Sequence, residues 1–284
     1  MGFPRPFWSQ RATLPPAASV SSCLSKAVTL IPDRQKGVLD SRTLQSKKIV
    51  QIGVGRGFGF AKLMASSGVS RFCLIDPQEV ALENVGLSAY ETSDVGFSKV
   101  AAAARHIHAV NPLAEVETLH CDARDLTDLA NRFAAADLIK IGVDDPPVQF
   151  EFADLAQTVS TDAMVCGMTG DGSQWFAAGI FPQGPTLREL LPEAWREIKA
   201  GARPPAFFPS CRINAETMNV NTTRLGLGLL HYRAGSPLPS AEIGEAFVQS
   251  PLAIGSNGFH APSGFLMPAR LLNASPPRTS GQAD

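Results

Sequence analysis

The sequence predicts an α/β protein with a mostly parallel sheet and helices on both faces. Two observations predict this fold. Short apolar segments alternate with helical segments in units of about 30 residues, which is the order that builds parallel sheets. The first apolar segment, 49–52, also runs directly into the loop Gly53-Val54-Gly55-Arg56-Gly57 and then into a helix. A strand, a glycine loop and a helix in this order are typical of Rossmann-like folds.

Each expected element is marked by its composition. Five short segments are predicted to be strands: 49–52, 71–75, 116–119, 137–143 and 163–167. Four segments between them carry helical patterns: 60–67, 99–110, 126–135 and 150–159. Gly68 follows the first of these helices as a C-terminal glycine, and Asn111-Pro112 ends the alanine-rich second one. The alternation of these nine elements is the basis of the fold prediction.

The chain divides into four predicted segments. Residues 1–45 form a proline-containing N-terminal arm, and 46–182 form the regular α/β domain. Residues 183–274 are predicted to be a loop-rich part of the same fold with one helix near 219–232, because thirteen of the 22 prolines follow residue 181. Residues 275–284 read as a disordered tail.

Composition excludes several classes of protein. With 25 basic and 26 acidic residues the formal net charge is −1, so we expect no nucleic-acid partner. No apolar run approaches the ~20 residues of a membrane-spanning helix, so we expect no membrane association. The five cysteines are far apart and form no C-x-x-C pair, which excludes a disulfide scaffold or a cysteine-ligated zinc site of the usual spacing. A reducing, cytoplasmic setting is therefore expected.

The glycine loop and one acidic residue predict a nucleotide site. The loop reads G-x-G-x-G-x-G and departs from the usual G-x-G-x-x-G spacing. Asp76 closes the second predicted strand, where a carboxylate can accept hydrogen bonds from ribose hydroxyls. The alternatives are a simple tight turn and a strand-end cap before Pro77. The order of strand, loop, helix and strand favours nucleotide binding.

Further motifs carry a resemblance to a known family. They are Leu74-Ile75-Asp76-Pro77-Gln78-Glu79-Val80, Glu83-Asn84, Val95-Gly96-Phe97-Ser98-Lys99 and Asn111-Pro112. In these motifs the chain resembles the ThiF/MoeB/HesA family of ubiquitin-activating-enzyme-like adenylyltransferases, over about residues 34–182. The V-G-x-x-K step and its spacing from Asn84 are the most specific part of the match.

The resemblance implies an activity and a set of roles. Members of the family use ATP and a protein's C-terminal carboxylate to form an acyl-adenylate and pyrophosphate. The implied partner is a ubiquitin-like or sulfur-carrier protein, the implied cofactors are ATP and Mg²⁺, and a homodimer is expected. The implied roles are Gly53, Gly55 and Gly57 under the phosphates, Asp76 at the ribose, Asn84 and Lys99 at the triphosphate, Asp144 at Mg²⁺, Arg34 at a neighbouring subunit's nucleotide and Cys211 as a later acyl acceptor. The alternatives without a function are a Lys99 exposed to solvent at the start of a helix, an Asp144 that begins a turn, and a half-buried Cys211 with no reactive role.

The chain also departs from the family pattern. Leu87 stands where the pattern has an arginine, Ile141 replaces the first acidic residue of D-x-x-D-N, and Asp145 replaces its asparagine. The glycine loop is one residue short, so Arg56 either crowds the phosphates or replaces the missing positive charge. These departures leave open a catalytically weakened nucleotide-binding or partner-binding subunit. The glycine loop and Asp76 also permit an NAD-dependent oxidoreductase, for which we find no catalytic Tyr-x-x-x-Lys.

Overall fold

The computed structural model describes residues 35–169, 172–202 and 210–256. Most of the predicted N-terminal arm, including Arg34, and the predicted tail at 275–284 lie outside the described residues. Within the described ranges, none of the helices combines the length and apolar character needed to cross a membrane.

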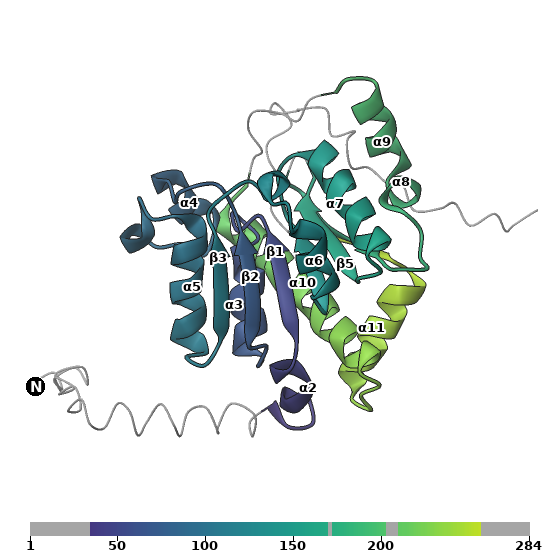
Figure 1. Ribbon diagram of the computed structural model, residues 1–284, viewed down its shortest axis with the longest axis horizontal. Helices are drawn as coiled ribbons and strands as arrows, with labels where there is room; N and C mark the ends of the chain where they lie inside the picture. Colours follow the sequence, from purple (N-terminus) through teal and green to yellow (C-terminus); the bar gives the residue numbers. More distant parts are fainter. Residues whose placement is uncertain (1–34, 170–171, 203–209, 257–284) are drawn as a thin grey trace, which may run out of the picture.

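The strands form one seven-stranded sheet in the order β3-β2-β1-β4-β5-β6-β7 (Figure 1). The strands are β1 (Lys48–Ile52), β2 (Arg71–Ile75), β3 (Glu115–Leu119), β4 (Leu138–Ile141), β5 (Ala163–Met168), β6 (Gln174–Ile180) and β7 (Leu252–Ser256). The first five strands in this order, from β3 through β2, β1 and β4 to β5, pair in parallel. β6 and β7 continue the sheet antiparallel. The prediction of a mostly parallel α/β sheet is therefore confirmed.

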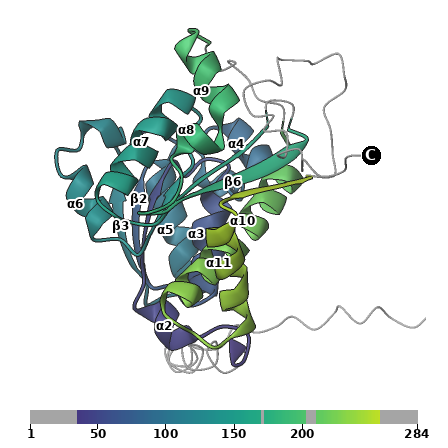
Figure 2. The same cartoon turned by 90° about the vertical axis from the view of Figure 1, so that its right-hand side faces the viewer.

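Helices cover both faces of the sheet. The helices and 3₁₀ turns (η) are α2 (Ser41–Gln45), α3 (Phe58–Ser66), α4 (Leu82–Leu87), η1 (Thr92–Asp94), α5 (Lys99–Val110), η2 (Ala123–Asp125), α6 (Leu129–Ala134), α7 (Pro146–Thr158), α8 (Leu187–Leu190), α9 (Pro192–Lys199), α10 (Arg212–Arg233) and α11 (Pro239–Gln249). α3, α5 and α10 share one apolar core with the sheet, whereas α6 and α7 share the other. Figure 2 shows α6 and α7 on one side of the strands and α10 and α11 on the other.

The described residues after 182 are more regular than we predicted. The described part of 183–256 holds four helices and β7, and β6 before it was not predicted. The proline content predicted loops here, and that prediction was wrong because Pro192 and Pro239 lie in the first turns of α9 and α11. A proline there sacrifices no helical hydrogen bond, since the first N–H groups of a helix have no intrahelical acceptor. The same arrangement begins α7 at Pro146, four residues before the predicted start.

A buried carboxylate fixes the segment that leads into α5. Asp94 accepts hydrogen bonds from the Glu91 N–H (2.8 Å) and from Arg105 Nη2 (2.9 Å), and it contacts His106 Nε2 at 2.7 Å. Its side chain is 4% exposed. Because Arg105 and His106 belong to α5, these bonds join the turn at η1 to the helix that begins with Lys99.

We expect Asp94→Asn to lower the free energy of unfolding near neutral pH by about 1–3 kcal/mol. Burial alone raises the pKa of Asp94, but the Glu91 N–H, His106 and Arg105 hold it below its ordinary value on balance. This stabilisation is therefore present above about pH 4, the carboxyl's unfolded pKa, and is lost as the pH falls through the lowered folded pKa.

Denaturant unfolding between pH 2.5 and 7 measures the effect. The loss of stability on the acid side should be shallower in Asp94→Asn than in the wild type. Asp128→Asn, at a half-exposed carboxylate paired with Arg132, serves as the control and should change stability little. Identical pH profiles for Asp94→Asn and wild type would contradict this account.

Candidate functional site

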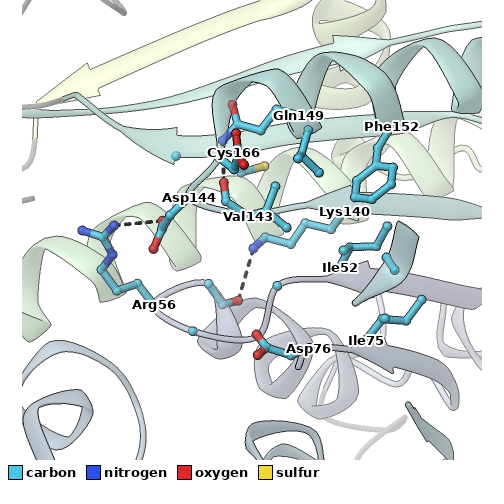
Figure 3. A pocket seen from close by; sticks show the side chains of 18 of the residues that line it. Ile52, Arg56, Ile75, Asp76, Lys140, Val143, Asp144, Gln149, Phe152 and Cys166 are labelled. Atoms are coloured by element: carbon cyan, nitrogen blue, oxygen red, sulfur yellow. Dashed lines mark hydrogen bonds and ion pairs between the residues drawn. The ribbon is translucent and has the colours of Figure 1, made fainter. Parts of the chain in front are cut away.

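A cavity of about 490 Å³ lies at the carboxyl ends of the central strands (Figure 3). β1 lies between β2 and β4, so successive strands are added to opposite sides of it. The loops after β1 and β4 therefore separate above the sheet, and open α/β sheets bind ligands at this position. The cavity is lined by the glycine loop, by residues that follow β2, β3 and β4, and by the last residues of β5. Its volume suits a small molecule.

The carbonyl groups of the glycine loop are bonded from within the protein. Gly55 O accepts from the Phe58 N–H. Three fully buried side chains hold the remaining loop carbonyls: Gln51 Nε2 donates to Gly53 O and Gly57 O at 3.0 Å, Asn219 Nδ2 to Arg56 O at 3.0 Å, and the Tyr90 hydroxyl to Val54 O at 2.6 Å. These hydrogen bonds to its carbonyl groups hold the loop in one conformation.

The same loop leaves two amide groups for a ligand. Among the residues that the structure describes, the N–H groups of Gly55 and Gly57 have no protein acceptor. Gly57 is the N-cap of α3 and has no side chain that could cap it. Both glycines line the cavity, and unsatisfied N–H groups at a helix N-terminus favour an anion.

Lys99 adds a cation to this end of the cavity. It is the first residue of α5 and is buried, and its Nζ donates to Gln78 Oε1 at 2.6 Å. A Cβ built at Gly55 would lie 3.8 Å from the Lys99 Nζ, so the ammonium is close to the loop. In the described part of the chain no carboxylate lies within ion-pair distance of it. Lys99 is thus a buried residue of the cavity wall, and the alternative of a solvated lysine is wrong.

Asp76 joins the glycine loop to the end of β2. Its two carboxylate oxygens accept hydrogen bonds from the Val54 N–H (2.8 Å) and the Gln78 N–H (2.9 Å). The residue is 5% exposed and lines the cavity. Each oxygen keeps a second lone pair, so the carboxylate can still accept from a ribose hydroxyl. That contact stays a prediction.

An ion pair spans the mouth of the cavity. Arg56 Nη2, from the glycine loop, lies 3.0 Å from Asp144 Oδ1, from the loop after β4 (Figure 3). The Asp144 side chain is 74% exposed, whereas that of Arg56 is 19% exposed. The structure describes no group of three or more acidic, histidine or cysteine side chains that could hold a metal ion by themselves. Mg²⁺ often binds through one or two carboxylates together with substrate phosphates, and Asp144 beside Asp145 fits that mode.

Other residues singled out by the sequence lie away from the cavity lining. Asn84 Oδ1 accepts from the Ala81 N–H at 2.9 Å and so caps α4, which also carries Leu87. Cys211 is the N-cap residue of α10, and its neighbour Ser210 lies against Met168 of the cavity wall. The structure therefore brings together the three loop glycines, Asp76, Lys99 and Asp144, and it leaves Asn84 and Cys211 outside the lining.

Lys140 was not among the site residues that the sequence predicted. This residue is in the middle of β4, is 0% exposed and belongs to the cavity lining. Burial lowers the pKa of its ammonium. The available signal was a lysine inside an apolar strand, in Leu138-Ile139-Lys140-Ile141, where a charged residue is rarely tolerated without a specific partner.

Comparisons with known proteins identify relatives. A sequence model of the ThiF family matches residues 29–235. The chain is 27% identical over 212 residues to the probable adenylyltransferase/sulfurtransferase MoeZ of Mycobacterium tuberculosis, a match that covers 70% of this chain and 51% of that protein. It is 33% identical over 86 residues to ubiquitin-like modifier-activating enzyme 5 of Drosophila simulans, covering 30% of this chain and 21% of that protein. The chain thus spans about half, or less, of the length of these two relatives.

A solved structure has a similar fold. The crystal structure of E. coli MccB with AMPCPP and MccA superposes with a TM-score of 0.55 at 17% sequence identity. The match covers 76% of this chain and 72% of that chain. At this identity the likeness establishes the fold.

Two glycines of the loop should respond differently to alanine. Gly53 has φ +80°, and a Cβ there would lie 2.5 Å from Gly142 O, so Gly53→Ala should lower the free energy of unfolding by about 2 kcal/mol or more. A Cβ at Gly55 meets only the Lys99 Nζ, at an ordinary 3.8 Å, so Gly55→Ala should keep its stability. Denaturant unfolding of both variants checks this, and equal stabilities would contradict the close approach of the loop to β4.

Proposed function

The chain belongs to the ThiF family, and from this premise we propose that it is an ATP-dependent adenylyltransferase that activates the C-terminal carboxylate of a ubiquitin-like or sulfur-carrier protein. One observation carries the proposal. The unpaired N–H groups of the glycine loop, the Lys99 ammonium and the Asp144 carboxylate meet around a single cavity. Two amide donors, a cation and an exposed carboxylate are the groups that a metal-bound triphosphate requires.

The chain's own residues suggest how ATP would be bound. The phosphates would lie against the N–H groups of Gly55 and Gly57, with Lys99 beside them, and the ribose would lie at Asp76. Asp144 would hold Mg²⁺, whose charge favours departure of pyrophosphate. The substrate carboxylate would attack the α-phosphorus, forming the acyl-adenylate as the bond to pyrophosphate breaks. Such chemistry depends on positioning and charge neutralisation, which a rigid loop and a buried lysine provide.

The relatives support the same class of substrate. Both curated relatives carry names that describe activation or adenylyl transfer, and MccB was crystallised with an ATP analogue and MccA. A homodimer, Asn84 at the triphosphate, Arg34 at a neighbouring nucleotide and acyl transfer to Cys211 stay predictions of the resemblance, as does a cytoplasmic setting. Ser210, the neighbour of Cys211, lies against Met168 of the cavity wall, which supports this prediction of a transfer to Cys211.

Two observations favour a second candidate function. Arg56 pairs with Asp144, the proposed metal ligand, and Leu87 offers no charge in place of the family's arginine. A catalytically weakened subunit that binds nucleotide or partner would tolerate both features. The two candidates differ in turnover, because only the enzyme exchanges pyrophosphate into ATP in the presence of its carrier.

We expect magnesium-dependent binding of ATP by calorimetry and no comparable binding of NADH. Lys99→Ala should weaken ATP binding about tenfold to a hundredfold, because it removes a charge-assisted contact to phosphate. Lys62→Ala removes a lysine of α3 outside the cavity lining and is the matched control. Undiminished ATP binding by Lys99→Ala would overturn its assignment, and NADH binding in the micromolar range would favour an oxidoreductase.

Pyrophosphate exchange separates the two candidate functions. With a panel of ubiquitin-like and sulfur-carrier proteins, wild-type protein should exchange labelled pyrophosphate into ATP, and Asp144→Asn should reduce the rate about 100-fold or more by removing the metal ligand. Asp128→Asn should exchange at the wild-type rate. Magnesium-dependent ATP binding without exchange across the panel would support the weakened subunit.

A further inference from the structure

Lys140 and Gln51 form a buried polar pair beneath the glycine loop. The two residues are Cα partners on the neighbouring parallel strands β4 and β1. Their strand neighbours alternate between the two apolar cores, so both side chains project to the face that α3 covers. The Lys140 Nζ donates to Gly57 O at 3.3 Å (Figure 3).

Two glycines make room for the Lys140 ammonium. A Cβ at Gly57 would overlap the Lys140 Nζ, and a Cβ at Gly142 would lie 2.8 Å from it. Because neither glycine has a side chain, only backbone separates the ammonium from the cavity, and Lys140 belongs to the lining. Any other residue at these positions would displace the ammonium or cover it.

The Lys140 ammonium has no anionic partner in the described part of the chain. Two ionisable groups face it, Cys166 on β5 and Asp144 after β4. Burial raises the pKa of the Cys166 thiol to about 11, so the thiol is neutral, and Asp144 is paired with Arg56. The remaining neighbours are uncharged: the Phe60 ring lies 5.5 Å away, and the buried Gln51 Oε1 has no hydrogen-bond partner. A buried cation without a counter-ion is costly, and this cost is why burial lowers the pKa of Lys140. An anion that approaches from the cavity would favour the charged form of the amine.

We propose that Lys140 neutralises phosphate charge from beneath the glycine loop, supplying to a bound nucleotide the positive charge that Leu87 lacks. The inference rests on the nucleotide site of the proposed function. Lys140 acts as a positioning and electrostatic residue, because its charge reaches the phosphates across the loop backbone. Charges interact more strongly in a buried, weakly polarisable environment than at an exposed surface, so a fully buried ammonium is effective without direct contact.

The test compares ligands that differ in phosphate number. Dissociation constants for adenosine, AMP, ADP and ATP with Mg²⁺ are measured by calorimetry at constant ionic strength. The variants are Lys140→Met, which has a similar length and no charge, and Lys140→Gln, which keeps a donor for Gly57 O. Lys62→Met, on α3 outside the lining, controls for net charge, and thermal unfolding shows that each variant is folded.

We expect both Lys140 variants to lose affinity in proportion to phosphate number, about tenfold to a hundredfold for ATP, with adenosine affinity unchanged. Lys140→Met should be at least as stable as the wild type, because an unpaired buried charge is removed. Equal losses for adenosine and ATP would assign Lys140 to loop support alone, and unchanged ATP affinity would also overturn the proposal. Wild-type protein that binds no ATP would overturn the proposed function itself, an outcome distinct from the other two.

Discussion

The site depends on how closely the loop after β1 passes the end of β4. Gly53 adopts a positive φ, and its backbone packs against Gly142, leaving no room for a Cβ. On either side of this crossing the Gly53 N–H donates to Ile75 O at 2.9 Å and the Gly142 N–H to Ile52 O at 2.8 Å, so the ends of β1, β2 and β4 are held together. The floor of the cavity, the start of α3 and the position of Asp144 all follow from this crossing.

A layer of buried polar side chains then fixes the loop from below. Gln51, Asn219 and Tyr90 bond its carbonyl groups, and Asp76 accepts from one of its amides. Burying such groups is unfavourable unless they are hydrogen-bonded, so a polar layer of this kind stabilises one loop conformation over its alternatives. The N–H groups of Gly55 and Gly57 in this loop lie at the cavity, where an anion can use them.

Charge in and around the cavity is distributed differently from the family pattern. The position of the family's arginine holds Leu87 in α4, none of whose residues is buried. The cations that the structure places at the loop are Lys99, Arg56 and Lys140, which come from three separate elements. Arg56 forms an ion pair with Asp144, whereas among the described residues Lys99 and Lys140 donate hydrogen bonds only to uncharged groups. An anionic ligand would therefore gain most from the two lysines.

Local patterns in the sequence determined much of this protein. Segments of strand length predicted the five parallel strands, and four of them are mostly apolar because a buried strand must be so regardless of its partners. The glycine loop, Asp76 and Lys99 were also identified, since each stands at an element boundary that the sequence marks. Only the tertiary structure decided which residues from distant segments of the chain lie in contact. The strand register placed Lys140 beside Gln51, loop packing joined Arg56 to Asp144 at a separation of 88 residues, and β6 and β7 extended the sheet antiparallel. A sequence pattern carries the period of a strand or helix, but which residues meet across the sheet is fixed only when the strands pair.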